Sequence, residues 1–300
     1  MQLIDGKYTA ETIREEIRQE VSRMINEGLR PPHLVAVLAG NDGASETYVA
    51  NKIRTCAEVG FRSTLERLPS DVSEDEVLSL IDRLNADDSV DGFIVQLPLP
   101  AHIDVHRITE RIRPEKDVDG FHPVNLGRMT EELPAYIPAT PKGIIQLLER
   151  YKIETEGKHC VVVGRSNIVG TPVSILLSRN TYPGNCTVTL THSRTQNLRA
   201  LTLQADILIA AIGKPYFITA DMVKEGAVVV DVGMTRVHAP ERKLGFKLAG
   251  DVDFEHVAPK CSWITPVPGG VGPMTIMGLL QNTLLAAQHR VYPEHVGQDI

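Results

Sequence analysis

Short apolar runs alternate with amphipathic segments along this sequence, and that alternation constrains the fold more than any other feature. Apolar residues recur every three or four positions over 9–27, which predicts a helix, and 34–40 is then a short buried strand. Strand–helix–strand units of this kind predict a parallel sheet covered by helices. The other elements expected in this half are a helix over 46–59 capped by Ser45, strands over 61–68 and 93–96, and a helix from the capping box Ser73–Glu76 to about Leu84.

The same alternation starts again after Pro138–Pro141. A length of 300 residues suits two domains of ~100–200 residues each. The predicted fold class is therefore α/β, with two α/β domains flanking a cleft and the second of them a Rossmann-like nucleotide-binding domain. The elements expected in this half are helices over 142–151, from Gly170 onward and over 273–290, and strands over 160–164, 187–191, 207–213 and 227–233.

The composition excludes several classes of protein. Acidic residues outnumber basic ones by 38 to 31, a net charge of −7, so we expect no nucleic-acid partner. No apolar run approaches the ~18 residues of a membrane span, and the N-terminus has no features of a secretory or transit signal. The four cysteines form no CxxC pair, so we expect free thiols in a reducing, cytoplasmic compartment, and no metal.

The segment Gly164–Gly170 follows a predicted strand and opens a predicted helix. Rossmann-like folds bind a dinucleotide pyrophosphate at this point, because the free N–H groups and the dipole of the helix favour an anion. The segment departs from G-x-G-x-x-G, since Ser166 replaces the second glycine and the last glycine comes one residue late. It predicts a cofactor site, and the competing interpretation is a tight turn that needs glycines for its backbone alone.

The end of the next strand indicates which cofactor binds. NAD-preferring folds place an acid there to hold the ribose 2′-hydroxyl, whereas Thr191–Thr195 contains none. Its Ser193 and Arg194, together with Arg165 in the glycine loop, suit a 2′-phosphate, because charge-assisted hydrogen bonds to phosphate are strong. The sequence therefore predicts NADP, and the competing interpretation is a polar loop at a strand end.

Two further strand ends carry glycines, at Gly213 and Gly233, where the backbone has room to approach the nicotinamide half of the cofactor. Asp231 stands at the second of these strand ends. We favour the interpretation that it is a buried acid bonded to backbone amides over a direct role in binding.

Candidate catalytic residues lie in the first half. Tyr48 and Lys52 are four apart on a predicted helix and so share one face. Gln96 ends a predicted strand, and Asp119 lies in the turn Lys116–Gly120. A Gly/Pro loop over 265–275 opens the last helix. All are positions from which a rigid scaffold presents side chains to a cleft.

Together these segments resemble the bifunctional methylenetetrahydrofolate dehydrogenase/methenyltetrahydrofolate cyclohydrolase family over nearly the whole chain. The resemblance implies two α/β domains, with the last helix returning to the first, and a homodimer. The expected folate-binding catalytic domain is then 1–140 plus 280–300, and the NADP-binding domain is 141–279. The segments that carry the resemblance are Ser45–Lys52, Asn85–Asp87, Phe93–Leu99, Pro114–Gly120, Gly164–Gly170 and Pro268–Thr275.

The resemblance also implies roles for individual residues. Lys52 would be the general acid/base of the cyclohydrolase step, with Gln96 hydrogen-bonded to it. Tyr48 would lie against the folate, and Asp119 would accept hydrogen bonds from the pterin. The residues implied in binding are Pro268, Gly269 and Gly272 for the tetrahydrofolate substrate, and Gly164, Arg165, Ser166, Ser193, Arg194 and Met234 for NADP.

The implied function is oxidation of 5,10-methylenetetrahydrofolate with NADP, followed by hydrolysis to 10-formyltetrahydrofolate in the same cleft. Three alternatives stay open. The first is a monofunctional or NAD-dependent methylenetetrahydrofolate dehydrogenase. The second is another two-domain nicotinamide dehydrogenase, and the third is a non-catalytic dinucleotide-binding module. Lys52, Gln96 and Asp119 argue against the last of these, because a module without catalysis does not need them at cleft positions.

Overall fold

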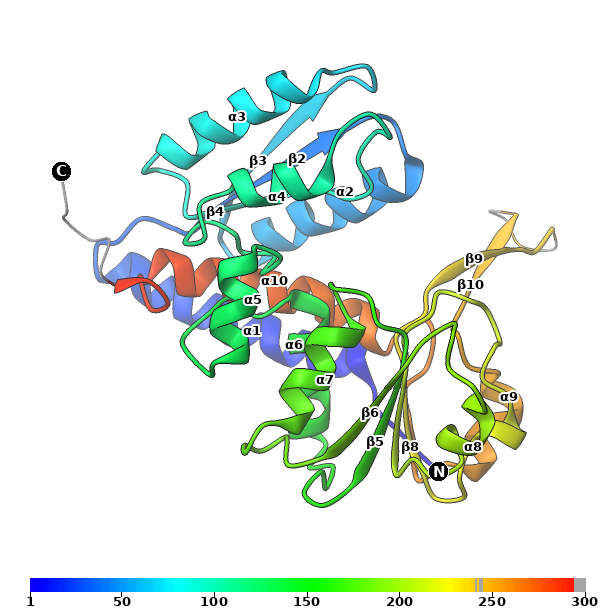
Figure 1. The fold of residues 1–300 in the computed structure, drawn as a ribbon. Helices are drawn as coiled ribbons and strands as arrows, with labels where there is room; N and C mark the ends of the chain where they lie inside the picture. Colours follow the sequence, from blue (N-terminus) through cyan, green and yellow to red (C-terminus); the bar gives the residue numbers. More distant parts are fainter. Residues whose placement is uncertain (241, 243–244, 294–300) are drawn as a thin grey trace. The chain divides into compact units, whose positions relative to one another are not determined.

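The computed structural model describes residues 1–240, 242 and 245–293. The chain divides into two compact units, whose elements are labelled in Figure 1. Unit 1 consists of Met1–Glu11 and Thr140–Thr275, and unit 2 of Thr12–Ala139 and the chain from Ile276 onward. Among the described residues, no helix is long and apolar enough to cross a membrane.

Unit 2 is built on a three-stranded parallel sheet in the order β3-β2-β4. The central strand β2 is buried at every residue, which explains its unbroken apolar sequence. Apolar residues of α3 and α4 pack on one face of the sheet. The elements are β2 (His33–Ala39), α2 (Gly43–Glu58), β3 (Arg62–Leu68), α3 (Glu74–Ala86), β4 (Gly92–Val95), α4 (Val105–Arg111) and α5 (Pro123–Thr130).

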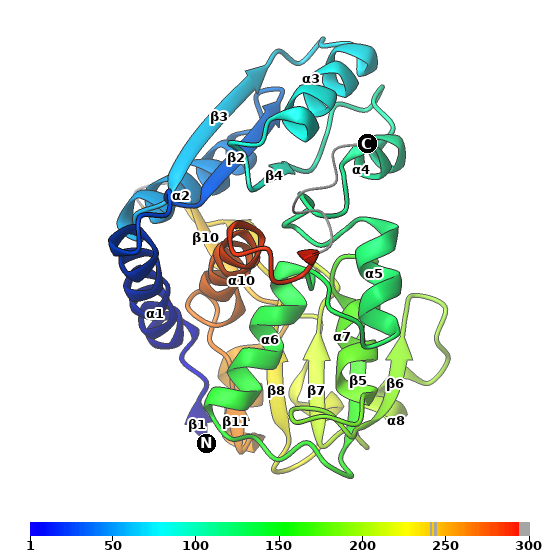
Figure 2. The same cartoon turned by 90° about the vertical axis from the view of Figure 1, so that its left-hand side faces the viewer.

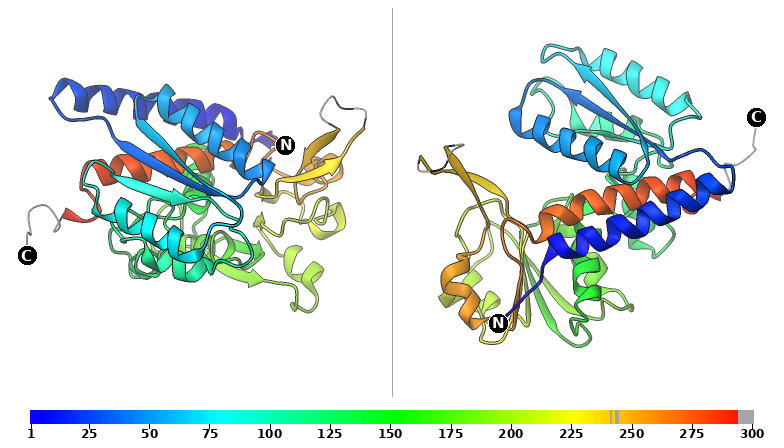
Figure 3. Two further views of the ribbon diagram at one scale, coloured as in Figure 1. Left: turned by 90° about the horizontal axis from the view of Figure 1, so that it is seen from above. Right: turned by 180° about the vertical axis from the view of Figure 1, so that it is seen from behind.

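Two helices that are far apart in the sequence lie side by side in unit 2. They are α1 (Gly6–Asn26), from Thr12 onward, and α10 (Val271–Ala287), from Ile276 onward (Figure 3). Just beyond α10, the Gln288 side chain donates a 2.6 Å hydrogen bond to Glu20 of α1. The last helix and the residue that follows it therefore pack against the first helix.

Unit 1 contains a six-stranded parallel sheet in the order β1-β11-β8-β7-β5-β6. Figures 1 and 2 show α6 and α7 on one face of this sheet and α8 and α9 on the other. The elements are β1 (Gln2–Leu3), α6 (Ala139–Arg150), β5 (His159–Val163), α7 (Gly170–Ser178), β6 (Thr187–Thr191), α8 (Leu198–Thr202), β7 (Ile207–Ala210), β8 (Val228–Asp231), α9 (Phe254–Val257), β11 (Trp263–Ile264) and the antiparallel hairpin β9 (Thr235–His238) and β10 (Phe246–Ala249).

Two differences from the sequence-based expectation concern the start of α2 and the place of the first eleven residues. Ser45 does not cap α2, because the Asp42 carboxylate accepts a 2.7 Å hydrogen bond from the Ser45 backbone N–H and the helix begins earlier. The first eleven residues lie in unit 1 rather than with the first half of the chain, because β1 pairs with β11 at the edge of the six-stranded sheet.

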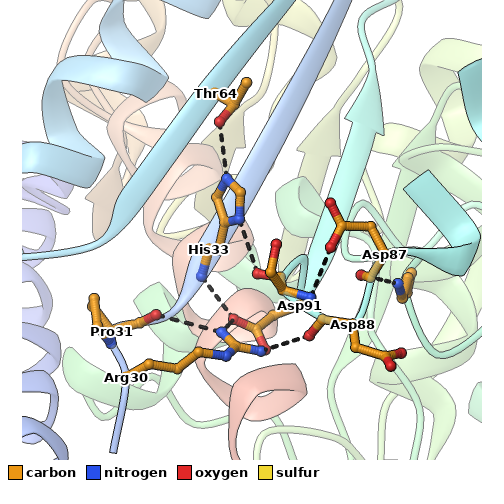
Figure 4. Close-up of polar contacts among 9 residues, drawn as sticks. Arg30, Pro31, His33, Thr64, Asp87, Asp88 and Asp91 are labelled. Carbon is orange, nitrogen blue, oxygen red and sulfur yellow. Dashed lines mark hydrogen bonds and ion pairs between the residues drawn. The ribbon is translucent and has the colours of Figure 1, made fainter. Parts of the chain in front are cut away.

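A polar network in which His33 and Asp91 are buried joins β2, β3 and the segment before β4 (Figure 4). Both terminal nitrogens of Arg30 donate to the Asp91 carboxylate, at 2.7 and 2.8 Å, and Asp91 also accepts from the His33 backbone N–H. The His33 ring bonds through Nδ1 to the Ser89 carbonyl and through Nε2 to the Thr64 hydroxyl, both at 2.9 Å. A carbonyl oxygen only accepts, so Nδ1 carries a proton.

This network makes the stability of the fold depend on pH. Burial is the main cause that lowers the pKa of His33 below its ordinary 6.5. The folded chain therefore binds a proton at His33 less readily than the unfolded chain, so stability is lost as pH falls from about 6.5 toward the lowered value. Between about pH 7.5 and pH 5, we expect the urea midpoint of the wild type to fall relative to that of His33→Asn, which lacks this histidine. The exposed His106→Asn is the matched control and should follow the wild type, and an equal change of midpoint in all three proteins contradicts this prediction.

Candidate active site and nucleotide site

Lys52 and Gln96 meet inside unit 2. The side chain of Lys52 on α2 is buried, with 8% of the residue exposed, and its Nζ donates a 3.1 Å hydrogen bond to Gln96 Oε1. Gln96 follows the last residue of β4, and its Nε2 donates a 2.7 Å bond to the Leu97 carbonyl. Because that carbonyl only accepts, the amide is held with its oxygen toward Lys52. The Lys52 Nζ thus faces a fixed acceptor.

Tyr48 lies one helical turn before Lys52 on α2. It is 38% exposed, in contrast to the buried lysine. Residues four apart on a helix share a face, so the aromatic ring and the amine line the same side of α2. An apolar surface beside a buried cation suits a flat, partly polar ligand.

Asp119 belongs to the same group of residues. It lies in the turn that the Gly120 N–H closes by donating to the Asp117 carbonyl, and it is half-buried. Burial raises the pKa of the Asp119 carboxyl, and the positive charge of Lys52 opposes that shift. Asp119 also lines a small cavity with Val95 and Leu97, the residues on either side of Gln96. Unit 2 therefore brings together Tyr48, Lys52, Gln96 and Asp119.

The other charged residues of the Lys116–Gly120 turn have partners within the fold. The Lys116 ammonium donates to the Leu84 and Asp87 carbonyls, and so satisfies the C-terminal end of α3. The Asp117 carboxylate is buried and accepts from the His122 backbone and the Asn125 side chain, at 2.8 and 2.9 Å. Burial raises the pKa of Asp117 to about 7. Both residues build the turn that presents Asp119.

In unit 1, the glycines of the Gly164–Gly170 loop are required by close backbone packing. Gly164 has φ +120°, and a Cβ there would lie 2.1 Å from the Ala211 carbonyl oxygen. A Cβ on Gly170 would lie 1.9 Å from the Gly164 carbonyl oxygen. The tight-turn interpretation therefore explains both glycines, and evidence for a ligand rests on the residues between them.

The residues between these glycines present a surface that suits an anionic ligand. Arg165 and Ser166 are exposed at the carboxyl end of β5. Ser166 Oγ accepts from the Val169 and Gly170 N–H groups, at 3.2 and 3.4 Å, and so orders the entry into α7. The loop thus presents a cation and a hydroxyl beside the start of a helix, where anions are favoured.

Ser193 and Arg194 are exposed just beyond β6, the neighbour of β5 in the sheet. Their turn is fixed by His192, whose ring Nδ1 accepts a 3.1 Å bond from the Arg194 N–H and whose own N–H donates to Thr195 Oγ1. β5 and β6 are parallel neighbours, so their carboxyl ends lie at the same end of the sheet. Arg165 and Arg194, which follow these two strands, therefore lie at that end as well. This carboxyl edge suits a ligand with several phosphate groups.

The favoured interpretation of Asp231 is confirmed. Its carboxylate is buried and accepts from the backbone N–H groups of Gly233, Asp251 and Val252, at 2.9 to 3.0 Å. Burial raises its pKa to about 7. Sequence reasoning missed Asp251, which is also buried and accepts from the Ile212 and Gly213 N–H groups. Asp231 and Asp251 together hold the glycine turns after β7 and β8. The one sequence signal for Asp251 is its position after a strand, in Gly250–Asp251.

The remaining predicted binding residues also lie in unit 1. Met234 follows β8 and is partly exposed. Pro268 borders a cavity of about 760 Å³ that is also lined by Asp231, Gly250 and Phe246. The Gly269 carbonyl accepts a 2.9 Å bond from the Lys7 N–H, and Gly272 lies in the first turn of α10. All nine predicted residues of unit 1 thus lie beyond strand ends, on the loop before α10 or in its first turn, the set being Gly164, Arg165, Ser166, Ser193, Arg194, Met234, Pro268, Gly269 and Gly272.

Comparisons with known proteins agree with this arrangement. Residues 4–119 match the catalytic domain of tetrahydrofolate dehydrogenase/cyclohydrolase, and residues 138–291 match its NAD(P)-binding domain. The bifunctional protein FolD of Cytophaga hutchinsonii is 62% identical over 287 residues, which cover 96% of this chain and 99% of that protein.

Solved structures give the same result. The bifunctional methylenetetrahydrofolate dehydrogenase/cyclohydrolase FolD of Campylobacter jejuni superposes with a TM-score of 0.90 at 45% identity, over 97% of this chain and 99% of that one. The dehydrogenase-cyclohydrolase of Trypanosoma brucei, solved with NADP and an inhibitor, also has a TM-score of 0.90, at 37% identity over 97% and 98% of the two chains. This chain belongs to the tetrahydrofolate dehydrogenase/cyclohydrolase family.

Proposed function

We infer that this protein oxidises 5,10-methylenetetrahydrofolate to 5,10-methenyltetrahydrofolate with NADP and hydrolyses that product to 10-formyltetrahydrofolate. Full-length similarity to bifunctional relatives supports both reactions. The observation that carries the second reaction is the buried Lys52 ammonium bonded to Gln96 near Asp119. The proposed functional division is a folate-binding domain of 1–140 plus 280–300 and an NADP-binding domain of 141–279, except that residues 1–11 lie in unit 1.

Each group in unit 2 has a distinct task. Tyr48 offers its ring to the pterin, and Asp119 accepts hydrogen bonds from the amino and N–H groups of the pterin, because an ionised carboxylate has acceptors only. Oxidation requires alignment more than proton transfer, since a nitrogen lone pair of the substrate expels the hydride. Hydrolysis requires protons to move as water adds to the methenyl carbon and the carbon–nitrogen bond breaks. Lys52 moves them, and Gln96 holds its Nζ in place.

The residues of unit 1 fit NADP. The close-packed turn at Gly164 and Gly170 brings backbone and a helix start to the carboxyl edge of the sheet, and Arg165 and Arg194 are exposed at the same edge. The same edge is bordered by Ser166, Ser193 and Met234. The two arginines are proposed to bind the 2′-phosphate. When bound, the cofactor supplies the hydride acceptor. Pro268, Gly269 and Gly272 are proposed to contribute to binding of the tetrahydrofolate substrate.

The two half-reactions test this proposal separately. Purified protein mixed with 5,10-methylenetetrahydrofolate and NADP should form NADPH, and protein given the methenyl compound alone should consume it faster than buffer does. Formation of NADPH without methenyl hydrolysis would identify a monofunctional dehydrogenase. Activity with NAD but not NADP would reverse the cofactor assignment, and no reaction with either nicotinamide would refute the proposal.

The family resemblance supports a homodimer in the cytoplasm. The net charge of −7 argues against a nucleic-acid partner, as does the small-molecule chemistry of the site. Sedimentation equilibrium should give twice the chain mass of 33.0 kDa, and a single-chain mass at micromolar concentration would exclude the dimer.

A further inference from the structure

Asn282 and Asn125, two fully buried asparagines, hold the backbone that leads to Asp119. Asn282, on α10, donates from Nδ2 to the carbonyls of Val118 and Ile137, at 2.8 and 2.9 Å. Val118 directly precedes Asp119 in the chain. The last helix therefore bonds to the peptide next to the candidate catalytic carboxylate.

Asn125, on α5, makes the second set of hydrogen bonds to the backbone around Asp119. Its Nδ2 donates to the Asp117 carboxylate and to the Pro114 carbonyl, both at 2.9 Å. Its Oδ1 accepts from the Tyr136 backbone N–H at 3.2 Å and from the Tyr292 hydroxyl at 2.7 Å. Tyr292 follows α10, so the C-terminal part of the chain reaches the turn a second time, through Asn125.

The far side of the turn is fixed by packing. Gly120 has φ +75°, and a Cβ on it would lie 2.6 Å from the Tyr136 carbonyl oxygen and 2.8 Å from the Pro138 nitrogen. The turn is therefore held by hydrogen bonds before Asp119 and by backbone contact after it. A buried amide is costly unless its groups are paired, so fully bonded asparagines favour one arrangement of the turn.

We propose that Asn282 and Asn125, the latter held by Tyr292, are positioning residues that set the place of the Asp119 carboxylate toward the folate. The inference rests on the proposed role of Asp119. Neither asparagine touches the substrate, and both act through the turn. A shift of about 1 Å in a reacting group lowers rates by as much as 10²-fold, so a loosened turn has a measurable cost.

The test measures KM for 5,10-methylenetetrahydrofolate and for NADP in Asn282→Leu and Tyr292→Phe. Asn282→Leu removes the hydrogen bonds to Val118 in the turn and to Ile137, and we expect the folate KM to rise about 10-fold or more while the NADP KM stays within about twofold. Tyr292→Phe keeps the ring and loses one hydroxyl, so we expect a smaller rise of about threefold in a protein that folds normally. The matched control is Thr283→Val, since Thr283 is buried next to Asn282 but bonds only to its own helix, at the Leu279 carbonyl.

A double-mutant comparison separates this inference from the role of Asp119. If Asn282 acts through Asp119, the folate KM of Asn282→Leu combined with Asp119→Asn should equal that of Asp119→Asn alone. Additive effects would overturn the inference, as would an unchanged folate KM in both Asn282→Leu and Tyr292→Phe. If Asp119→Asn itself leaves the folate KM unchanged, the proposed role of Asp119 fails, and the inference fails with it. Should Asn282→Leu not fold, Tyr292→Phe combined with Asp119→Asn decides the question in the same way.

Discussion

Replacing Lys52 by alanine is expected to slow methenyltetrahydrofolate hydrolysis by roughly 10²–10⁴-fold, the range over which general acid–base groups contribute. The Lys52 ammonium is buried and bonded to Gln96, so its removal takes away the group that moves protons and leaves the partly buried Gln96 oxygen without this donor. Hydride transfer should fall less, because that step depends on alignment of the substrate. The measurement is the initial rate of each half-reaction with saturating substrate.

Arg54→Ala is the matched control for this variant. Arg54 is another cation on α2, but its side chain is 70% exposed and pairs with Glu58 at 3.6 Å. An exposed pair of this kind contributes little to stability, so both half-reactions should proceed at the wild-type rate. Normal methenyl hydrolysis by Lys52→Ala would show that another group carries the proton transfers.

The second large effect is expected when Arg165 and Arg194 are both replaced by alanine. Hydrogen bonds to charged groups contribute about 1.5–3 kcal/mol each, which is roughly 10- to 100-fold in affinity. The KM for NADP should therefore rise at least 10-fold, whereas the KM for NAD, which has no 2′-phosphate, should change by less than about threefold. Initial rates over a range of both cofactors give the two values.

Arg199→Ala controls for a general loss of positive charge in this part of unit 1. Arg199, in the first turns of α8, is exposed and forms a 2.9 Å ion pair with Asp221. Its loss should leave the ratio of the two KM values unchanged. If the double variant at Arg165 and Arg194 keeps the wild-type ratio, the 2′-phosphate is bound elsewhere.

Local pattern was enough to predict most elements of the fold. The strand expected over 187–191 is β6 to the residue, and the capping box Ser73–Glu76 opens α3 with both of its hydrogen bonds. These features depend on residues close together in the sequence, and so they can be recognised without the structure. The hairpin β9–β10 escaped notice because each strand has four residues and Ala249 is the one buried residue among the eight.

Residues that act across long stretches of sequence could not be found in the same way. Asn282 bonds to Val118 over 164 positions, and Asp251 bonds to Gly213 over 38. A buried asparagine or aspartate has no periodic signature, so its partner appears only when the fold brings the two segments together. Lys52, Gln96 and Asp119 were identified by the family resemblance of their motifs, and the structure adds the hydrogen bond and the buried turn that connect them.

The central claim is that one chain carries out both reactions in sequence. The most direct measurement supplies the purified protein with 5,10-methylenetetrahydrofolate and NADP, and quantifies NADPH and 10-formyltetrahydrofolate over time. The proposed function predicts that the two products form in equal amounts, and that in Lys52→Ala NADPH forms while the methenyl compound accumulates. Accumulation of the methenyl compound by the wild type, with no 10-formyltetrahydrofolate above the uncatalysed rate, would contradict the claim.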